Sequence, residues 1–339
     1  MVILRLHRAG FVLIAAYALF STAPSSPLHA HERPLGDGKI SSSPRQGHLM
    51  SCQTRFNPNA PGSRRTGSWV RGGSYFINEK PVVDGQVTWP SEISVALEGD
   101  RRNVRANNLP DHPTGVFPVS RSDDAFAYDR NPNPIRPQTI LLSLPANPQP
   151  AASPSCVPMG MIGFMLSGGA LYNAVDARGR DAPAYEMQDA CSGHPQQTGQ
   201  YHYHDRSACL KDTRSQPGGH SDLVGYALDG FGIFGIHGEG GKVMTNADLD
   251  ACHGHSHVIE WNGRHVEMYH YHLTDQYPYS IGCYRGTPIE VSGAMSGQSG
   301  RGRPPEGRPG GGQRPPGFRR GPPPRLGPPP RRPAFDPAG

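Results

Sequence analysis

The chain has 339 residues, including 43 glycines and 37 prolines, and only 35% of its residues are hydrophobic. This composition disfavours long helices and is typical of turns and short strands, and a mean hydropathy of −0.56 argues against a multi-span membrane protein. The formal charge of +5 is unevenly spread along the chain. Residues 293–339 contain nine arginines and two acidic residues, Glu306 and Asp336, and so carry a net charge of +7. The rest of the chain therefore carries a net charge of −2. The body therefore gives no indication of a specific nucleic-acid surface.

The N-terminus has the pattern of an export signal. Arg5, His7 and Arg8 precede an apolar run at residues 9–20, which is too short to span a bilayer comfortably. We predict a signal peptide over residues 1–30, cleaved after Ala30, and a periplasmic or secreted protein with no transmembrane span after removal. An uncleaved anchor is the alternative.

The segments that follow are predicted from composition and alternation. Residues 31–65 are polar and rich in Ser, Pro and Arg, so we expect them to be loosely ordered. A predicted domain spans 66–290, with strands expected at 68–77, 82–89, 93–97 and 139–144 and a turn-dense loop at 107–115.

Within this domain the sequence repeats itself. Residues 163–172 parallel 225–234, and 189–194 parallel 250–255. Tyr-His-Tyr-His occurs at 201–204 and again at 269–272, and the two copies end at Cys209 and Cys283. We predict a mainly β fold with irregular loops, in which duplicated halves at 163–209 and 225–283 each contain a β-hairpin and are related by a pseudo-twofold.

The turn residues predict how the second hairpin pairs. Asn262-Gly263 between two alternating runs favours a two-residue type I′ turn. Trp261 then faces Arg264, His255 faces His270, and His253 faces His272. Alternation places these four histidines on one face of the hairpin.

The first hairpin gives the same cross-strand pair from a different turn. If His194 faces His202, the loop is Gln197-Thr198-Gly199, and Gly199 falls where a three-residue turn favours a left-handed residue. His204 then faces Ser192.

The spacing of these histidines predicts a metal site. The candidate ligands are His194, His202, His204, His255, His270, His272 and, as an extra, His253. Three imidazoles with an open position suit zinc or copper, in one shared site or in two. Asp189 and Asp250 precede the cysteines of both copies, and they either orient histidine N–H groups as acceptors or cap turns. The alternative is a hydrogen-bonded His/Tyr network that stiffens the core.

An even number of cysteines in an exported chain indicates disulfides. The repeat suggests that Cys191–Cys209 and Cys252–Cys283 each bracket a histidine hairpin, and that Cys52–Cys156 ties down the N-terminal part.

The tail at 291–339 consists largely of Gly, Pro and Arg, and we predict that it is disordered. It is either a solvated extension or a loose electrostatic contact with anionic surfaces. No other partner is predicted.

The chain resembles the YHYH-domain family of exported, mostly bacterial proteins. The motifs that carry the resemblance lie between about 107 and 290 and are specific: the 108–115 loop, 189–194, both Tyr-His-Tyr-His copies, 225–235 and 277–288. The tail is outside the family pattern. The resemblance implies a secreted β-rich domain and supplies no catalytic residues.

Three functions follow as hypotheses. The first is binding of copper or zinc outside the cytoplasm. The second is a metal-dependent hydrolase or oxidoreductase, which needs an open coordination position beside a pocket with an acid/base group such as Asp189 or Asp250. The third is a structural or adhesive surface protein whose histidines only pack.

Overall fold

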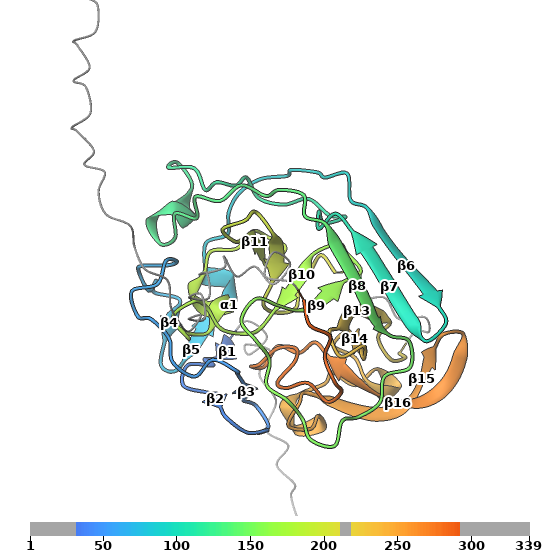
Figure 1. The fold of residues 1–339 in the computed structure, drawn as a ribbon. Helices are drawn as coiled ribbons and strands as arrows, with labels where there is room; N and C mark the ends of the chain where they lie inside the picture. Colours follow the sequence, from blue (N-terminus) through green and yellow to red (C-terminus); the bar gives the residue numbers. More distant parts are fainter. Residues whose placement is uncertain (1–31, 211–217, 292–339) are drawn as a thin grey trace, which may run out of the picture. The chain divides into compact units, whose positions relative to one another are not determined.

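Most of the chain folds into short strands and irregular loops, as the computed structural model in Figure 1 shows. The structure describes residues 32–210 and 218–291; the predicted signal peptide and the tail beyond residue 291 lie outside the described residues. The described elements are β1 (Glu32–Pro34), β2 (Ile40–Ser41), β3 (Leu49–Met50), β4 (Val70–Arg71), β5 (Ser74–Phe76), β6 (Ile93–Glu98), β7 (Arg101–Ala106), β8 (Ile140–Pro145), β9 (Met161–Met165), β10 (Ala170–Tyr172), α1 (Ala182–Tyr185), β11 (Gly193–Pro195), β12 (Tyr201–Tyr203), β13 (Leu223–Ala227), β14 (Gly232–Phe234), β15 (Gly254–Trp261) and β16 (Arg264–His272), with short 3-10 turns at Ile77–Glu79, Asp124–Ala127, Glu239–Gly241 and Asn246–Asp248.

An eight-stranded sheet holds both copies of the repeat, in the order β11-β12-β10-β9-β13-β14-β16-β15. The order is symmetric about its centre, where β9 and β13 pair antiparallel with Phe164 opposite Tyr226. In each half a parallel pair, β10 with β12 or β14 with β16, joins the histidine hairpin to the central strands. The predicted mainly β fold with pseudo-twofold halves is confirmed.

Both hairpins pair as their turns predicted. His194 lies opposite His202 and His255 opposite His270, while Trp261 faces Arg264. Gly199 has φ 91°, and Asn262 and Gly263 have φ 53° and 73°, as a three-residue turn and a type I′ turn require.

A three-stranded sheet, β6-β7-β8, lies on one side of the molecule (Figure 1). The sequence prediction missed β7 because its residues are mostly polar. Arg102 on β7 is nevertheless buried, and its guanidinium stacks over the rings of Tyr226 and Trp261 at 4.5 and 4.4 Å.

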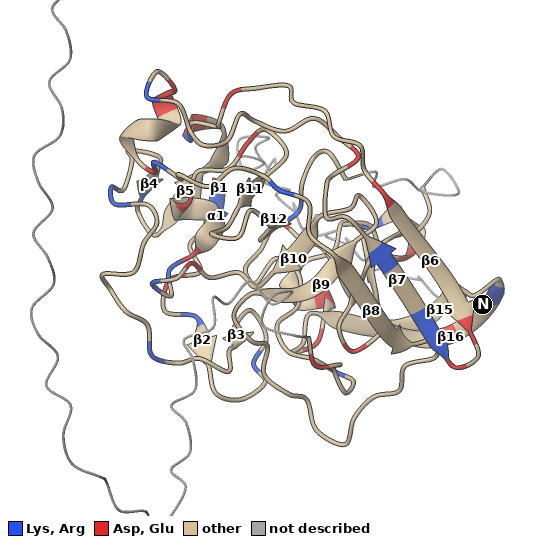
Figure 2. Cartoon of the chain, turned by 45° about the horizontal axis from the view of Figure 1, so that its top comes forward, with Lys and Arg blue, Asp and Glu red and all other residues tan. Residues whose placement is uncertain are grey.

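The strand expected at 82–89 forms only isolated bridges at Val83 and Val87. Acidic and basic positions are interspersed along the described chain (Figure 2).

The N-terminal segment differs from the loose order expected for residues 31–65. It carries β1, β2 and β3, and β1 joins β5 and β4 in a second three-stranded sheet. Buried Arg33 anchors this segment, because its guanidinium binds Asp205 at 2.7 Å and Asp275 at 2.6 Å. Polar composition predicted loose order here, but this arginine forms a buried ion pair that holds the segment to the rest of the fold.

The structure contains the three disulfides that the repeat suggested: Cys52–Cys156, Cys191–Cys209 and Cys252–Cys283. Three disulfides are typical of an oxidising compartment. Among the described residues, none of the helices has the length and apolar character that crossing a bilayer demands.

Candidate metal centres

The first cluster consists of His194, His202 and His204, and all three side chains are buried. His194 lies on β11, His202 lies on β12, and His204 follows β12 directly. One ring nitrogen from each lies within 4.8 Å of the others, and the Nε2 atoms of His202 and His204 are 3.1 Å apart. The hairpin register thus brings together the three imidazoles predicted from the first copy.

Backbone carbonyls orient two of these rings. His204 Nδ1 lies 2.5 Å from the carbonyl oxygen of Asn173, and His202 Nδ1 lies 3.2 Å from that of Gln200. A carbonyl can only accept, so each Nδ1 carries a proton, and in the neutral form of each ring the Nε2 lone pair faces the cluster. This is the tautomer in which Nε2 binds a metal.

Glu186 completes the first cluster from the C-terminal end of α1. Its Oε2 lies 3.1 Å from His204 Nε2 and 3.3 Å from His194 Nε2. The side chain is only 13% exposed. Sequence reasoning counted this glutamate as a carboxylate without assigning it to a site.

The second cluster consists of His220, His255, His257, His270 and His272. The ring nitrogens of the first four lie within 4.8 Å of one another. His272 Nε2 lies 3.2 Å from His220 Nε2 and 3.0 Å from His255 Nε2, and His220 Nε2 lies 3.3 Å from His270 Nε2. The two clusters have no residue in common.

Carbonyl acceptors orient the rings of the second cluster in the same way. His272 Nδ1 donates to the carbonyl oxygen of Gly235 at 2.6 Å, and His220 Nδ1 donates to that of Ser221 at 2.6 Å. His270 Nδ1 donates to the Met268 carbonyl at 3.1 Å. Three Nε2 lone pairs therefore face one another without a proton between them.

His253 does not join the second cluster, contrary to its prediction as an extra ligand. Its φ of 73° takes it out of the regular strand, and its Nε2 lies 3.0 Å from Thr274 Oγ1. Ser192, the equivalent residue of the first copy, has a similar φ of 58°. The alternation argument failed here because the backbone leaves extended geometry one residue before β15.

A family model described as YHYH protein matches residues 142–242. The similarity to this family is therefore shown for residues 142–242, which include the first Tyr-His-Tyr-His copy. The match includes the first cluster, Glu186 and His220, and ends before His255. No curated protein and no solved structure matches the chain.

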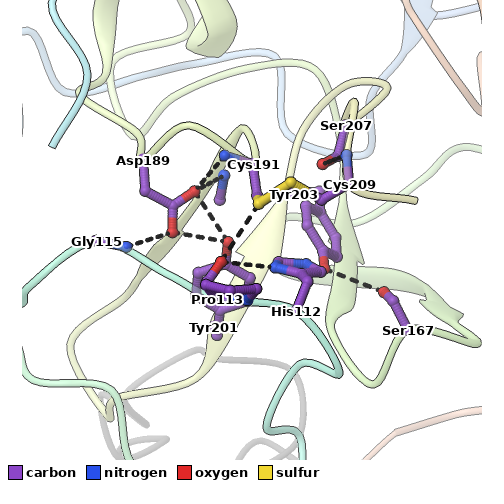
Figure 3. Close-up of a disulfide and its surroundings, with 11 residues drawn as sticks. His112, Pro113, Gly115, Ser167, Asp189, Cys191, Tyr201, Tyr203, Ser207 and Cys209 are labelled. Atoms are coloured by element: carbon purple, nitrogen blue, oxygen red, sulfur yellow. Dashed lines mark hydrogen bonds between the residues drawn. A yellow bond between two sulfur atoms is a disulfide. The ribbon is translucent and has the colours of Figure 1, made fainter. Parts of the chain in front are cut away.

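The tyrosines of the first YHYH motif point away from the histidines. Tyr201 donates to both carboxylate oxygens of Asp189, at 3.1 and 3.0 Å, and the Tyr203 hydroxyl lies 2.6 Å from His112 Nε2 (Figure 3). Asp189 also accepts from the backbone N–H groups of Cys191 and Gly193.

Asp250 has the same role in the second copy, where it accepts from Tyr269 at 2.9 Å and from the N–H groups of Cys252 and Gly254. Both aspartates therefore cap turns and bind tyrosines. Of the two roles considered for these aspartates, the contacts are those of turn capping and not of orienting histidines, because alternation along the strand places tyrosines and histidines on opposite faces.

His112 lies near the sulfur atoms of Cys191 and Cys209. These cysteines form a disulfide, so neither is a thiolate ligand (Figure 3). This group stabilises the tyrosine face of the YHYH motif and is not a metal centre.

Burial favours the neutral form of four histidines of the second cluster, His220, His255, His270 and His272. It lowers the pKa of His255 to about 4 and lowers the pKa values of His220, His270 and His272 as well. The repulsion that each imidazolium would feel from its neighbours acts in the same direction. Neutral imidazole is the form that binds metal ions.

The first cluster has a different electrostatic balance. Burial disfavours charge on both His204 and Glu186, but contacts between Glu186 and the histidines outweigh it. Glu186 raises the pKa of His204, while His194 and His204 together lower the pKa of Glu186 well below its usual value. The pKa of His202 is lowered, mainly by burial. Glu186 thus stabilises positive charge at the centre of this cluster.

A pocket of about 600 Å³ opens beside the first cluster. All three histidines and Glu186 line it, together with Asp129 and Tyr172. Within the described part of the chain, no lysine or arginine lines this pocket. It gives the first cluster a route to solvent.

Three residues of these clusters were missed by the sequence analysis: Glu186, His220 and His257. Glu186 and His220 lie outside the hairpins, and contacts between segments leave no periodic pattern. His257 could have been found, because the predicted alternation places it on the same face of β15 as His255.

Proposed function

We propose that this YHYH-family protein binds transition-metal ions, zinc or copper, at two separate histidine centres. The observation that carries the proposal is the convergence of Nε2 lone pairs in both clusters, with the Nδ1 atoms held by backbone carbonyls. Buried lone pairs that face one another repel unless a cation lies between them. A divalent metal ion removes this repulsion in both halves.

The distances between donor atoms fit such an ion. Metal–nitrogen bonds of roughly 2.0–2.1 Å in a tetrahedron place the ligand atoms roughly 3.3 Å apart. The first cluster has donor separations of 3.1, 3.1 and 3.3 Å. The second has 3.0, 3.2 and 3.3 Å.

We place this function outside the cytoplasm, in the periplasm or the medium. The three disulfides and the predicted signal peptide support this location.

The pocket beside the first cluster supports a second candidate function, a metal-dependent enzyme. A catalytic centre needs an accessible coordination position and a nearby acid/base group. Asp189 and Asp250 do not line this pocket, whereas Asp129 does. An exchangeable water on the bound metal, detected by solvent proton relaxation of a paramagnetic derivative, distinguishes catalysis from storage.

Elemental analysis of the full exported chain, purified without a His tag, tests metal binding. We expect about two equivalents of metal per chain after reconstitution, because the clusters are separate. Less than about half an equivalent favours a purely structural histidine network. His202→Gln is expected to retain one equivalent, whereas His265→Gln, at an exposed position on β16, retains two. Full stoichiometry in His202→Gln contradicts the assignment of the first centre.

A further inference from the structure

The two halves share three histidines and differ in the donors that complete each cluster. His194, His202 and His204 of the first half correspond to His255, His270 and His272 of the second through the repeat. Equivalent cross-strand pairs, His194–His202 and His255–His270, hold both sets. The shared part of the two clusters is therefore three imidazoles.

The first half adds a carboxylate. Glu186 Oε2 lies within 3.3 Å of two Nε2 atoms and is fully enclosed, with no other hydrogen-bond partner among the described residues. The residue equivalent to Glu186, counted from the aspartates that cap the turns, is Ala247. The second half consequently has no carboxylate at this position.

The second half adds imidazoles. His220 Nε2 lies 3.3 and 3.2 Å from the Nε2 atoms of His270 and His272, and His257 lies in the same group. The residues equivalent to His220 and His257 in the first half are Pro158 and Gln196. Glu239 lies near this cluster, but its side chain is 73% exposed and its Oε1 is 3.9 Å from His257 Nδ1.

Resting on the proposed function, we infer that the two centres select different ions: Glu186 makes the first a zinc site of three imidazoles and one carboxylate, and the nitrogen-only second centre takes copper. Among divalent ions copper binds nitrogen donors most strongly, so it occupies the centre with the most imidazoles. A carboxylate offsets part of the charge of a buried divalent ion and is a common zinc ligand. Zinc is therefore retained at the first centre.

Competitive loading tests this inference. The full exported chain, stripped with a chelator, receives one equivalent each of Cu²⁺ and Zn²⁺, and bound metal is measured by elemental analysis and by electron paramagnetic resonance of Cu²⁺. We expect one copper and one zinc per chain, with a copper spectrum that shows nitrogen ligands only.

Two reciprocal variants assign the ions to the centres. Glu186→Gln preserves size and is expected to weaken zinc binding by roughly tenfold or more, with the copper spectrum unchanged. His220→Asn is expected to change the copper spectrum and leave zinc affinity unchanged. Glu260→Gln, an exposed glutamate on β15, is the control and should alter neither.

The outcomes separate the two proposals. A wild-type chain that binds neither metal overturns the proposed function itself. If the wild-type chain binds metal, two results for Glu186→Gln overturn only the assignment of different ions. One is an altered copper spectrum, and the other is a zinc affinity within about twofold of wild type. If Glu186→Gln fails to fold, zinc loss in His220→Asn overturns the assignment independently.

Discussion

The aspartate at the start of α1, Asp181, is fully buried with an unusual set of partners. Its Oδ2 accepts from the Tyr279 hydroxyl and from the Gly36 N–H, both at 2.7 Å, while Oδ1 has no partner among the described residues. Burial raises the pKa of Asp181 to about 7, although these two donors oppose the shift. The folded protein thus holds a proton that the unfolded chain releases at much lower pH.

This raised pKa predicts how stability depends on pH. The contribution of Asp181 is fully present below its unfolded pKa of about 4 and is lost as pH rises through the folded pKa of about 7. Between pH 5 and pH 8 we expect the unfolding free energy of wild type to fall by an amount on the order of 2 kcal/mol through Asp181, and we expect this fall to be absent in Asp181→Asn. Urea unfolding of wild type and variant at both pH values measures it. Asp100→Asn, exposed in the turn after β6, is the control, and equal pH slopes for wild type and Asp181→Asn would contradict the prediction.

At the scale of elements, the hairpin turns made the register predictable. Asn262-Gly263 and Gly199 determine which residues face each other, and the His194–His202 and His255–His270 pairs follow from local geometry alone. Glu186 and His220 reach the clusters through tertiary packing, which no short-range pattern specifies. The structure therefore brings the predicted histidines of each half close together, and it adds Glu186 and His220, which make the two clusters different.

The turn of the second hairpin gives a direct test of that local control. Gly263 has φ 73° and has open space where a Cβ would lie, so a side chain there meets conformational strain and no clash. Gly263→Ala should cost about 1 kcal/mol of unfolding free energy. Chemical denaturation measures the cost. The control is Val258→Ala, at a position on β15 that is 59% exposed, and its unfolding free energy should lie within about 0.5 kcal/mol of the wild-type value. An unchanged midpoint for Gly263→Ala would argue against the type I′ turn.

At the scale of the whole described molecule, one arginine joins three distant segments. Arg33 on β1 binds Asp205, which directly follows the first Tyr-His-Tyr-His, and Asp275, which lies three residues after the second. Asp205 is 1% exposed, whereas Asp275 is 40% exposed. The N-terminal segment therefore stabilises the ends of both histidine hairpins.

Removing Arg33 should be costly, because the buried carboxylate of Asp205 would lose its ion-pair partner. We expect Arg33→Met to destabilise the fold by about 3–5 kcal/mol. Asp275→Asn removes only a half-exposed partner and should cost less than about 1 kcal/mol. Thermal and urea unfolding at pH 7 compare the two variants, and equal losses would show that the buried pair is not the anchor.

The central pairing of β9 with β13 has a consequence for a chain that carries only one copy of the repeat. Such a chain would leave the backbone N–H and C=O groups along one side of β9 without partners. A second identical molecule could supply them in the same antiparallel arrangement, with Phe164 facing its counterpart across a twofold axis. The present protein thus has, within one polypeptide, the arrangement expected of such a homodimer, and because its two halves are separate stretches of sequence they can carry different side chains beside their hairpins.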